Sequence, residues 1–474
     1  MGSKSTAQSA AINLLNTIIG AGMLAMPYAI RADGIILGIL VIITSAITSS
    51  FGLYLQGQCS KYVKTGEASF FALAQLTYPQ LSVVFDLAIA IKCFGVGISY
   101  LVVVGDLVPK IVQSLANEEF INQHLILTDR NFWITIIMIF IVVPLSFLKK
   151  LDSLKYASMI ALSSVVYLVI LVFVHFAKND IVDKGPVRFI KPYNVSSIFA
   201  SFPIFVFAYT CHQNMFSLVN ELDDKSNKNI NKVIGSAIGI AMTLYILVGV
   251  TGYLSFGDNV EPNVIVGYSH AISSTIGRIA IVILVMLSFP LQCHPARASI
   301  NHILFYFKQV EKKVRTAASN ASMRTNITNR TQGQNNTTAT QSDESDQLID
   351  YDYQDGLLEE GSHAAVSPLK GTRFIIITSI ILILSYLIAI SVTSLAHVLA
   401  FVGSTGSTSI SFILPGIFGF KLIGSEYIDP ETGTFEEIPR KTKIIKYLGC
   451  ALSIWGLLVM VICLSATIFL GASH

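Results

Sequence analysis

The sequence predicts an all-α polytopic membrane protein with 11 transmembrane helices, and composition and the length of its apolar runs are the first two reasons. The chain has 474 residues, of which 53% are hydrophobic and 13% are charged. An ordinary soluble domain has about 25% charged residues. The mean hydropathy is +0.63. Apolar runs of about 20 residues recur along the chain, and this length spans a hydrocarbon core roughly 30 Å thick.

Apolar windows separated by turn residues define the individual spans. The predicted ranges are 7–30, 35–57, 82–109, 132–149, 156–177, 197–219, 233–256, 271–293, 373–393, 396–419 and 447–470. Residues 1–419 are expected to form the core, and residues 447–474 the last helix with a short C-terminus. The polar segment 308–370 is rich in Ser, Thr, Asn and Gln, which predicts a disordered loop. A second loop is predicted at 420–446.

The distribution of basic residues is the third reason. With the N-terminus in the cytosol, 23 Lys and Arg residues lie on the cytosolic side and 8 on the other, while Lys92 lies inside a span. Cytosolic loops carry an excess of Lys and Arg. The asymmetry therefore predicts a cytosolic N-terminus, an odd number of spans and a lumenal C-terminus. The segment 178–191 is the one discordant loop.

The first apolar run is interrupted at its centre by Gly20-Ala21-Gly22, and Pro27 follows in the same run. Glycine weakens a helix by about 1 kcal/mol and proline by about 3 kcal/mol. Backbone groups freed in mid-membrane are costly unless they face protein, water or a ligand. Two interpretations follow from these residues alone. They form either a glycine surface for a neighbouring helix or a break between two half-helices around a small polar site.

The sixth run is interrupted in a comparable way, between Phe207 and Cys211, and His212 follows. Polar residues in mid-membrane are expensive unless they line a cavity. Interrupted helices at corresponding positions of two halves are the best sequence indication of a secondary-transporter site. We therefore expect helices one to five (7–177) and six to ten (197–419) to form inverted repeats, with helix eleven peripheral.

Five stretches now carry a resemblance to a known family. They are Asn13–Tyr28 (NLLNTIIGAGMLAMPY), Lys92–Asp106 (KCFGVGISYLVVVGD), Phe205–Leu222 (FVFAYTCHQNMFSLVNEL), Ser288–Pro295 (SFPLQCHP) and Ala400–Pro415 (AFVGSTGSTSISFILP). With them the chain resembles the amino acid/auxin permease family, and within it the fungal vacuolar amino-acid transporters and the sodium-coupled neutral amino-acid transporter branch. The resemblance implies a LeuT-like 5+5 inverted repeat plus one extra helix, a substrate site at the membrane midplane, and coupling to Na⁺ or H⁺.

Backbone groups at the two interruptions are the first candidates for binding an amino acid. The N–H groups of Gly20, Ala21 and Gly22 would start a half-helix, whose dipole favours a carboxylate. Carbonyl groups from the first half-helix and from Phe205 to Ala208 would hold the ammonium group. The complete set of predicted substrate-binding residues is Thr17, Gly20, Ala21, Gly22, Lys92, Tyr100, Phe205, Phe207, Ala208 and Tyr209.

Candidates for ion coupling are Asn16, Lys92, His212 and Ser288. The resemblance places a coupling cation near Asn16, and sodium-coupled relatives use a hydroxyl group, usually of threonine, in the region of Ser288. Lys92 either faces the pathway as a cation, snorkels to the interface, or pairs with Asp86. Pairing is disfavoured because residues six apart lie about 240° apart around a helix. We expect no cofactor and no metal site, with a proton, or Na⁺ as the alternative, as the coupling ion.

The sequence contains no nucleophile–base pair, metal cluster or phosphate loop, so we expect a transporter and no enzyme. The resemblance suggests proton-coupled export of neutral or acidic amino acids across a vacuolar or lysosomal membrane by alternating access. The alternatives are a transport-inactive amino-acid sensor and a Na⁺-coupled symporter of the plasma membrane. Expected partners are the amino acid, the bilayer and a sorting adaptor that would read Glu344, Leu348 and Ile349, which fit an acidic dileucine signal.

Overall fold

The computed structural model describes residues 5–148, 155–331, 371–427 and 438–471. In these ranges, nine helices are long and apolar enough to cross a membrane, and ten if the bent pair α1 (Ala7–Ile18) and α2 (Ala21–Asp33) is one span. A shorter apolar helix at Arg130–Ser146 occupies the predicted fourth span. The all-α membrane class is confirmed, while the number of 11 spans stays a prediction.

The remaining elements follow in chain order. The α-helices are α3 (Ile35–Cys59), α4 (Phe70–Thr77), α5 (Ser82–Leu115), α6 (Glu118–Gln123), α7 (Arg130–Ile137), α8 (Val143–Ser146), α9 (Lys155–Lys178), α10 (Val195–Ala208), α11 (His212–Glu221), α12 (Asn227–Phe256), α13 (Ile272–Thr331), α15 (Thr372–Ser391), α16 (Leu395–Val402), α17 (Leu414–Leu422) and α18 (Arg440–Gly471). The π-helical turns are η4 (Met138–Val142), η9 (Gly403–Ser407) and η10 (Ser409–Ile413).

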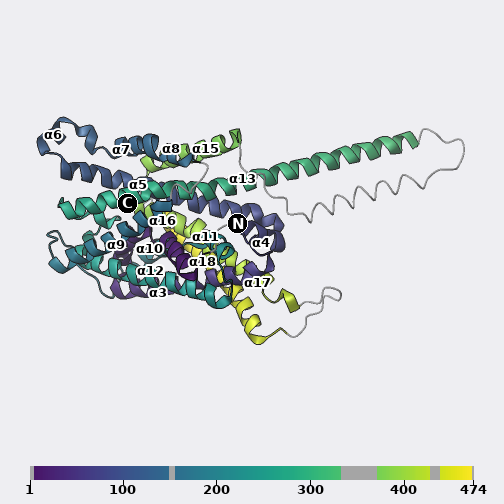
Figure 1. Cartoon of the computed structure of the whole chain (residues 1–474), viewed down its shortest axis with the longest axis horizontal. Coiled ribbons are helices and arrows are strands. Elements are labelled where there is room, and N and C mark those ends of the chain that lie inside the picture. The colour runs from purple at the N-terminus through teal and green to yellow at the C-terminus, as the bar shows by residue number, and fades with distance from the viewer. Residues whose placement is uncertain (1–4, 149–154, 332–370, 428–437, 472–474) are drawn as a thin grey trace.

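The long helices lie side by side in one bundle (Figure 1). The most apolar window of α5 is 83% buried, so α5 runs through the interior and packs along α13 and η9. Helix α12 packs against α1, α2 and α3, and α10 packs against α2. The corresponding window of α18 is only 22% buried, which agrees with the predicted peripheral position of the last helix.

Helix α13 differs from the expectation. It continues to Thr331 and extends well beyond the bundle (Figure 1), so residues 308–331 are helical where a disordered loop was predicted. Lys, Glu, Arg and Ala, which favour helices, are frequent in its extension and oppose the signal of the polar residues. The rest of that predicted loop, with Glu344, Leu348 and Ile349, lies outside the described residues.

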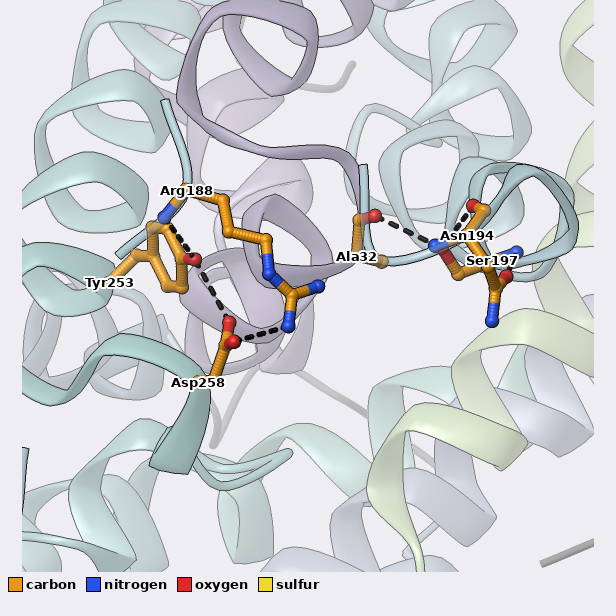
Figure 2. A network of polar contacts seen from close by, with 6 residues as sticks. All are labelled: Ala32, Arg188, Asn194, Ser197, Tyr253 and Asp258. Carbon is orange, nitrogen blue, oxygen red and sulfur yellow. Dashed lines mark hydrogen bonds and ion pairs between the residues drawn. The ribbon is translucent and has the colours of Figure 1, made fainter. Parts of the chain in front are cut away.

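A segment between α9 and α10, residues 179–194, crosses the face of the bundle opposite to the start of α1. We call it the strap. Carbonyl groups of Arg188 and Phe189 accept hydrogen bonds from Ile35 and Ile36 at 3.1 and 2.9 Å, which ties the strap to the α2–α3 corner. Arg188 also pairs with Asp258, and Figure 2 shows this contact together with the Tyr253 hydroxyl.

The strap accounts in part for the discordant loop in the charge pattern. The Arg188 guanidinium pairs with Asp258 and lies 4.4 Å from the centre of the Tyr193 ring, and the Arg31 guanidinium lies 5.7 Å from the same ring. Ion pairing and stacking on aromatic rings are structural uses of a positive charge. Arg188 thus has a structural role in the packing of this face, which accounts for a basic residue in a loop that is predicted to lie outside the cytosol.

Candidate functional site

The first break lies between α1 and α2, whose axes differ by 56°. Helix α1 ends at Ile18, and α2 begins at Ala21 with Gly20 as its N-cap. The N–H groups of Gly20, Ala21 and Gly22 donate to no acceptor among the residues that the structure describes. The first N–H groups of a helix have no intrahelical partner. The break therefore presents donors that suit a carboxylate.

The second break is shorter than predicted. Helix α10 continues through Ala208, and only Tyr209 to Cys211 separate it from α11. The Thr210 N–H donates to the Phe207 carbonyl at 3.0 Å, and the Thr210 hydroxyl donates to the Val206 carbonyl at 2.8 Å. Two carbonyl groups of the predicted stretch, those of Val206 and Phe207, are thus already bonded to Thr210, which lies one turn further along the chain.

Phe205 and Phe207 take part differently from the prediction. Phe205 lies inside α10 with a fully buried side chain. The Phe207 ring lies 3.6 Å from the position that a Cβ atom would have at Gly22. Phe207 thus contributes an apolar surface beside Gly22, and Ala208 supplies the carbonyl at the end of the helix.

The two breaks meet at the centre of the bundle. A Cβ atom at Gly22 would lie 3.0 Å from both Cα and Cβ of Ala208, so a larger residue would require the end of α10 to shift. The Tyr245 hydroxyl of α12 lies 2.8 Å from the carbonyl oxygens of both Ile18 and Ala208. The Tyr100 hydroxyl lies 3.7 Å from a Cβ position at Gly20. Free donors and converging acceptors are thus close together, as an amino acid with opposite charges on neighbouring groups requires.

A buried polar cluster adjoins the second break. We define the His212 cluster as His212, Ser49, Gln56, Thr210 and Ser411. The imidazole Nε2 lies 3.1 Å from the Ser49 carbonyl oxygen, and Nδ1 lies 3.0 Å from the Ser411 hydroxyl. Both ring nitrogens therefore have partners, and His212 is fully buried. The cluster joins α3, α11 and η10 in the membrane interior.

Lys92 lies within the protein, with 3% of its surface exposed, in the neighbourhood of Cys211 and His212. No described residue accepts a hydrogen bond from its ammonium group. Asp86 instead contacts His302, with 3.2 Å between Oδ1 and Nδ1. This geometry agrees with neither snorkelling nor an Asp86–Lys92 pair. A buried ammonium next to a candidate binding site is a functional-site hypothesis.

Thr17, a predicted substrate-binding residue, lies in the last turn of α1 and faces α11. Its hydroxyl accepts a hydrogen bond from Asn214 and donates one to the Asn13 carbonyl, both at 3.0 Å. It lines a crevice of about 170 Å³ between α1 and α11, together with Ser5, Ala10, Asn13, Leu14, Asn214, Ser217, Leu218 and Glu221.

Asn16 and Ser288 are half-buried, and no polar contact joins either of them to another residue in the described part of the chain. Tyr209 is fully buried, and its ring packs edge-on against Tyr245 with centroids 5.2 Å apart. Its hydroxyl has no partner within the described ranges. The cation site at Asn16 and Ser288 therefore stays a prediction.

Sequence reasoning missed several residues of this region, namely Tyr245, Ser49, Gln56, Ser411 and Asn214. A polar residue within an apolar run, such as Tyr245 between Leu244 and Ile246, was the available signal. That signal is weak because a lone tyrosine in a membrane helix can face several neighbours.

Comparisons with known proteins agree with this geometry. Residues 3–462 match the family described as transmembrane amino acid transporter protein. The chain is 48% identical to vacuolar amino acid transporter 6 of Saccharomyces cerevisiae over 98% of this chain and 99% of the relative. It is 38% identical to vacuolar amino acid transporter 5 of Schizosaccharomyces pombe over 97% of this chain and 94% of the relative. Identity to human sodium-coupled neutral amino acid transporter 7 is 26%, over 63% of this chain and 64% of the relative.

Two solved structures share the architecture at 12% identity, which shows the fold alone. MhsT in complex with L-phenylalanine has a TM-score of 0.56, covering 97% of this chain and 100% of that chain. The inward-facing conformation of Mhp1 has a TM-score of 0.55, covering 99% and 92%. The predicted LeuT-like fold is confirmed.

Proposed function

The chain belongs to the transmembrane amino acid transporter protein family, and from this premise we propose that it is a secondary active amino-acid transporter of the vacuolar membrane. It exports neutral or acidic amino acids from the lumen to the cytosol together with protons, by alternating access. The names of the similar yeast proteins support the compartment and the class of substrate.

The contact between Gly22 and Ala208 is the observation that carries this proposal. It brings the free N–H groups of one break beside the end of the helix before the other. The substrate carboxylate binds the N–H groups of Ala21 and Gly22, where the helix dipole adds to the hydrogen bonds. The substrate ammonium binds the carbonyl oxygens of Ile18 and Ala208. The Tyr100 hydroxyl, from α5, lies next to Gly20 and bounds the site on that side.

Lys92 and His212 support coupling to protons. Both are buried basic side chains near the second break, and neither has a carboxylate partner among the described residues. Protons are the natural driving ion for a membrane with an acidic lumen. Position 288 is a serine, whereas the resemblance to sodium-coupled transporters implies a threonine in this region, and this difference supports protons over sodium. The Lys92 ammonium also offers a partner for the side chain of an acidic substrate.

The test uses the full chain purified into liposomes, with labelled amino acids and an imposed pH gradient. Acid outside should drive accumulation of the substrate. With one proton moved per substrate, the inside-to-outside concentration ratio at equilibrium should rise by about tenfold for each pH unit of gradient. A protonophore should abolish this effect, and replacement of Na⁺ by choline should leave it unchanged. Uptake that is indifferent to the protonophore would contradict proton coupling.

The alternatives give different results in the same assay. A Na⁺-coupled symporter requires the sodium gradient in place of the pH gradient. A transport-inactive sensor binds amino acids, detectable as a rise in thermal stability, but moves none across the liposome membrane. Substrate flux across the liposome membrane would therefore contradict the sensor, whereas stabilisation by an amino acid without flux would support it.

A further inference from the structure

Tyr245 occupies a position that links the two breaks through a single oxygen atom. Its side chain is fully buried in α12, and its hydroxyl lies 2.8 Å from the carbonyl oxygens of both Ile18 and Ala208. The two carbonyl oxygens are therefore no further apart than twice that distance. Each belongs to the last residue of a half-helix, where carbonyl groups lack their usual intrahelical donor.

Hydroxyl chemistry limits what Tyr245 can satisfy. A tyrosine hydroxyl has one proton, whereas each carbonyl oxygen has two lone pairs. Tyr245 therefore leaves most of the acceptor capacity of the two carbonyls unused, and it can also accept a hydrogen bond itself. An ammonium group carries three donors, and it is the group that complements such a set of oxygen atoms at hydrogen-bond distance.

The surrounding packing fixes the hydroxyl at this point. Helix α12 packs along both α1 and α2, and the Tyr209 ring holds the Tyr245 ring edge-on at 5.2 Å. The Tyr245 side chain therefore has little freedom to leave the breaks. It holds the two carbonyl oxygens in a fixed relation, which neither half-helix could maintain alone across its break.

We propose that Tyr245 is a positioning residue that holds the carbonyl oxygens of Ile18 and Ala208 side by side, so that they bind the α-ammonium group of the substrate together. The inference rests on the proposed function, because it assumes an amino acid at the breaks. It assigns to α12 a role in substrate affinity that the two interrupted helices alone do not supply.

The variant Tyr245→Phe removes only the hydroxyl. The 20 protein amino acids are first tested, each in labelled form, for transport by the wild-type protein in liposomes. The amino acid that is transported fastest serves as the probe. We expect KM for the probe to rise by about three- to tenfold, the range of one net hydrogen bond, with the maximal rate changed much less. The analogue of the probe that lacks the α-amino group should inhibit the variant and the wild type equally well.

Tyr386→Phe is the matched control, because it removes the hydroxyl of a half-buried tyrosine that contacts Thr135 at 2.9 Å, away from both breaks. It should leave KM unchanged. An unchanged KM in Tyr245→Phe overturns the positioning role, and so does equal weakening of the probe and of its deaminated analogue, which indicates a general loss of structure. If the wild type transports no amino acid at all, the proposed function itself fails, and this result is distinct from the other two.

Discussion

Gly406 lies directly against the backbone of Lys92: a Cβ atom at position 406 would stand 2.6 Å from the Lys92 amide nitrogen and 2.8 Å from its Cα. Gly406 belongs to the π-helical turn η9, and Lys92 to the interior helix α5. π-Helical turns occur often at functional sites. The buried ammonium therefore owes its position to a close backbone approach that only glycine allows.

Gly406→Ala should consequently disturb the site. The added methyl group meets backbone atoms, which cannot rotate away, so α5 or η9 must shift at a cost of about 1–3 kcal/mol in the free energy of unfolding. Transport should fall because Lys92 moves with α5. Thermal unfolding in detergent and flux in liposomes measure the two effects.

Gly239→Ala provides the control for Gly406→Ala. Gly239 lies in α12, and a Cβ atom there meets nothing within 4 Å. Alanine is favoured over glycine in a helix by about 1 kcal/mol, so this variant should be as stable as the wild type or more so. If Gly406→Ala and Gly239→Ala were equally stable, α5 and η9 would have to lie further apart at Gly406 than the structure shows.

Composition and helix-breaking residues predicted the membrane class and both interruptions, because their physical causes are local. Gly20-Ala21-Gly22 weakens a helix wherever it is placed. The partners of His212 could not be predicted in this way, since Ser49 and Ser411 approach it from segments 163 and 199 residues away. The same holds for Tyr245, whose partners lie 227 and 37 residues away. Long-range contacts depend on how the helices pack, and no single run of residues encodes them.

Replacement of Lys92 by methionine tests its role in coupling. Methionine has a similar length but no charge. Removing a buried ammonium that has no partner among the described residues should leave the stability unchanged or raise it. The accumulation driven by a pH gradient should disappear, while exchange of labelled for unlabelled substrate at equal pH continues. Lys92→Ala should lose coupling in the same way but also leave a cavity. Lys110→Met is the control, because Lys110 lies near the C-terminal end of the same helix, and this variant should keep its response to pH. Normal pH-driven accumulation in Lys92→Met would reduce Lys92 to a structural residue.

A double substitution tests the contact between Asp33 and Ser201 at the end of α2. Asp33 is fully buried, its Oδ1 accepts a hydrogen bond from the Ser201 hydroxyl at 2.9 Å, and its Oδ2 has no partner among the described residues. Ser201→Ala alone removes the one hydrogen bond that this carboxyl group receives from a described residue, and it should cost about 1–3 kcal/mol. In the Asp33→Asn background the same change should cost less, because the amide carries no charge. Thermal unfolding of the four proteins measures this coupling, and strictly additive effects would contradict it.

The ion pair between Arg188 and Asp258 gives the strap a testable role in closing one face of the bundle. The two side chains are 26% and 11% exposed, and the Tyr253 hydroxyl donates a second hydrogen bond to Asp258 at 3.0 Å (Figure 2). Arg188→Gln removes the side-chain pair with Asp258, which lies in the turn after α12, and leaves the backbone hydrogen bonds that join the strap to Ile35, Ile36, Phe256 and Asp258. We expect the strap to be held less tightly. A cysteine introduced at Ala32, beneath the strap, should then react faster with a membrane-impermeant thiol reagent added from that face. Asp258→Asn should increase the reaction rate similarly, and the double variant should add little, because both changes break one pair.

Lys184→Gln is the control for this experiment, since Lys184 lies in the same strap with an exposed side chain and has no described ion-pair partner. It should leave the labelling rate at Ala32 unchanged. If Arg188→Gln and Lys184→Gln increase labelling equally, net charge in the strap governs access instead of the pair. If neither changes it, backbone contacts alone hold this face closed, and the pair with Asp258 only orients the Arg188 side chain.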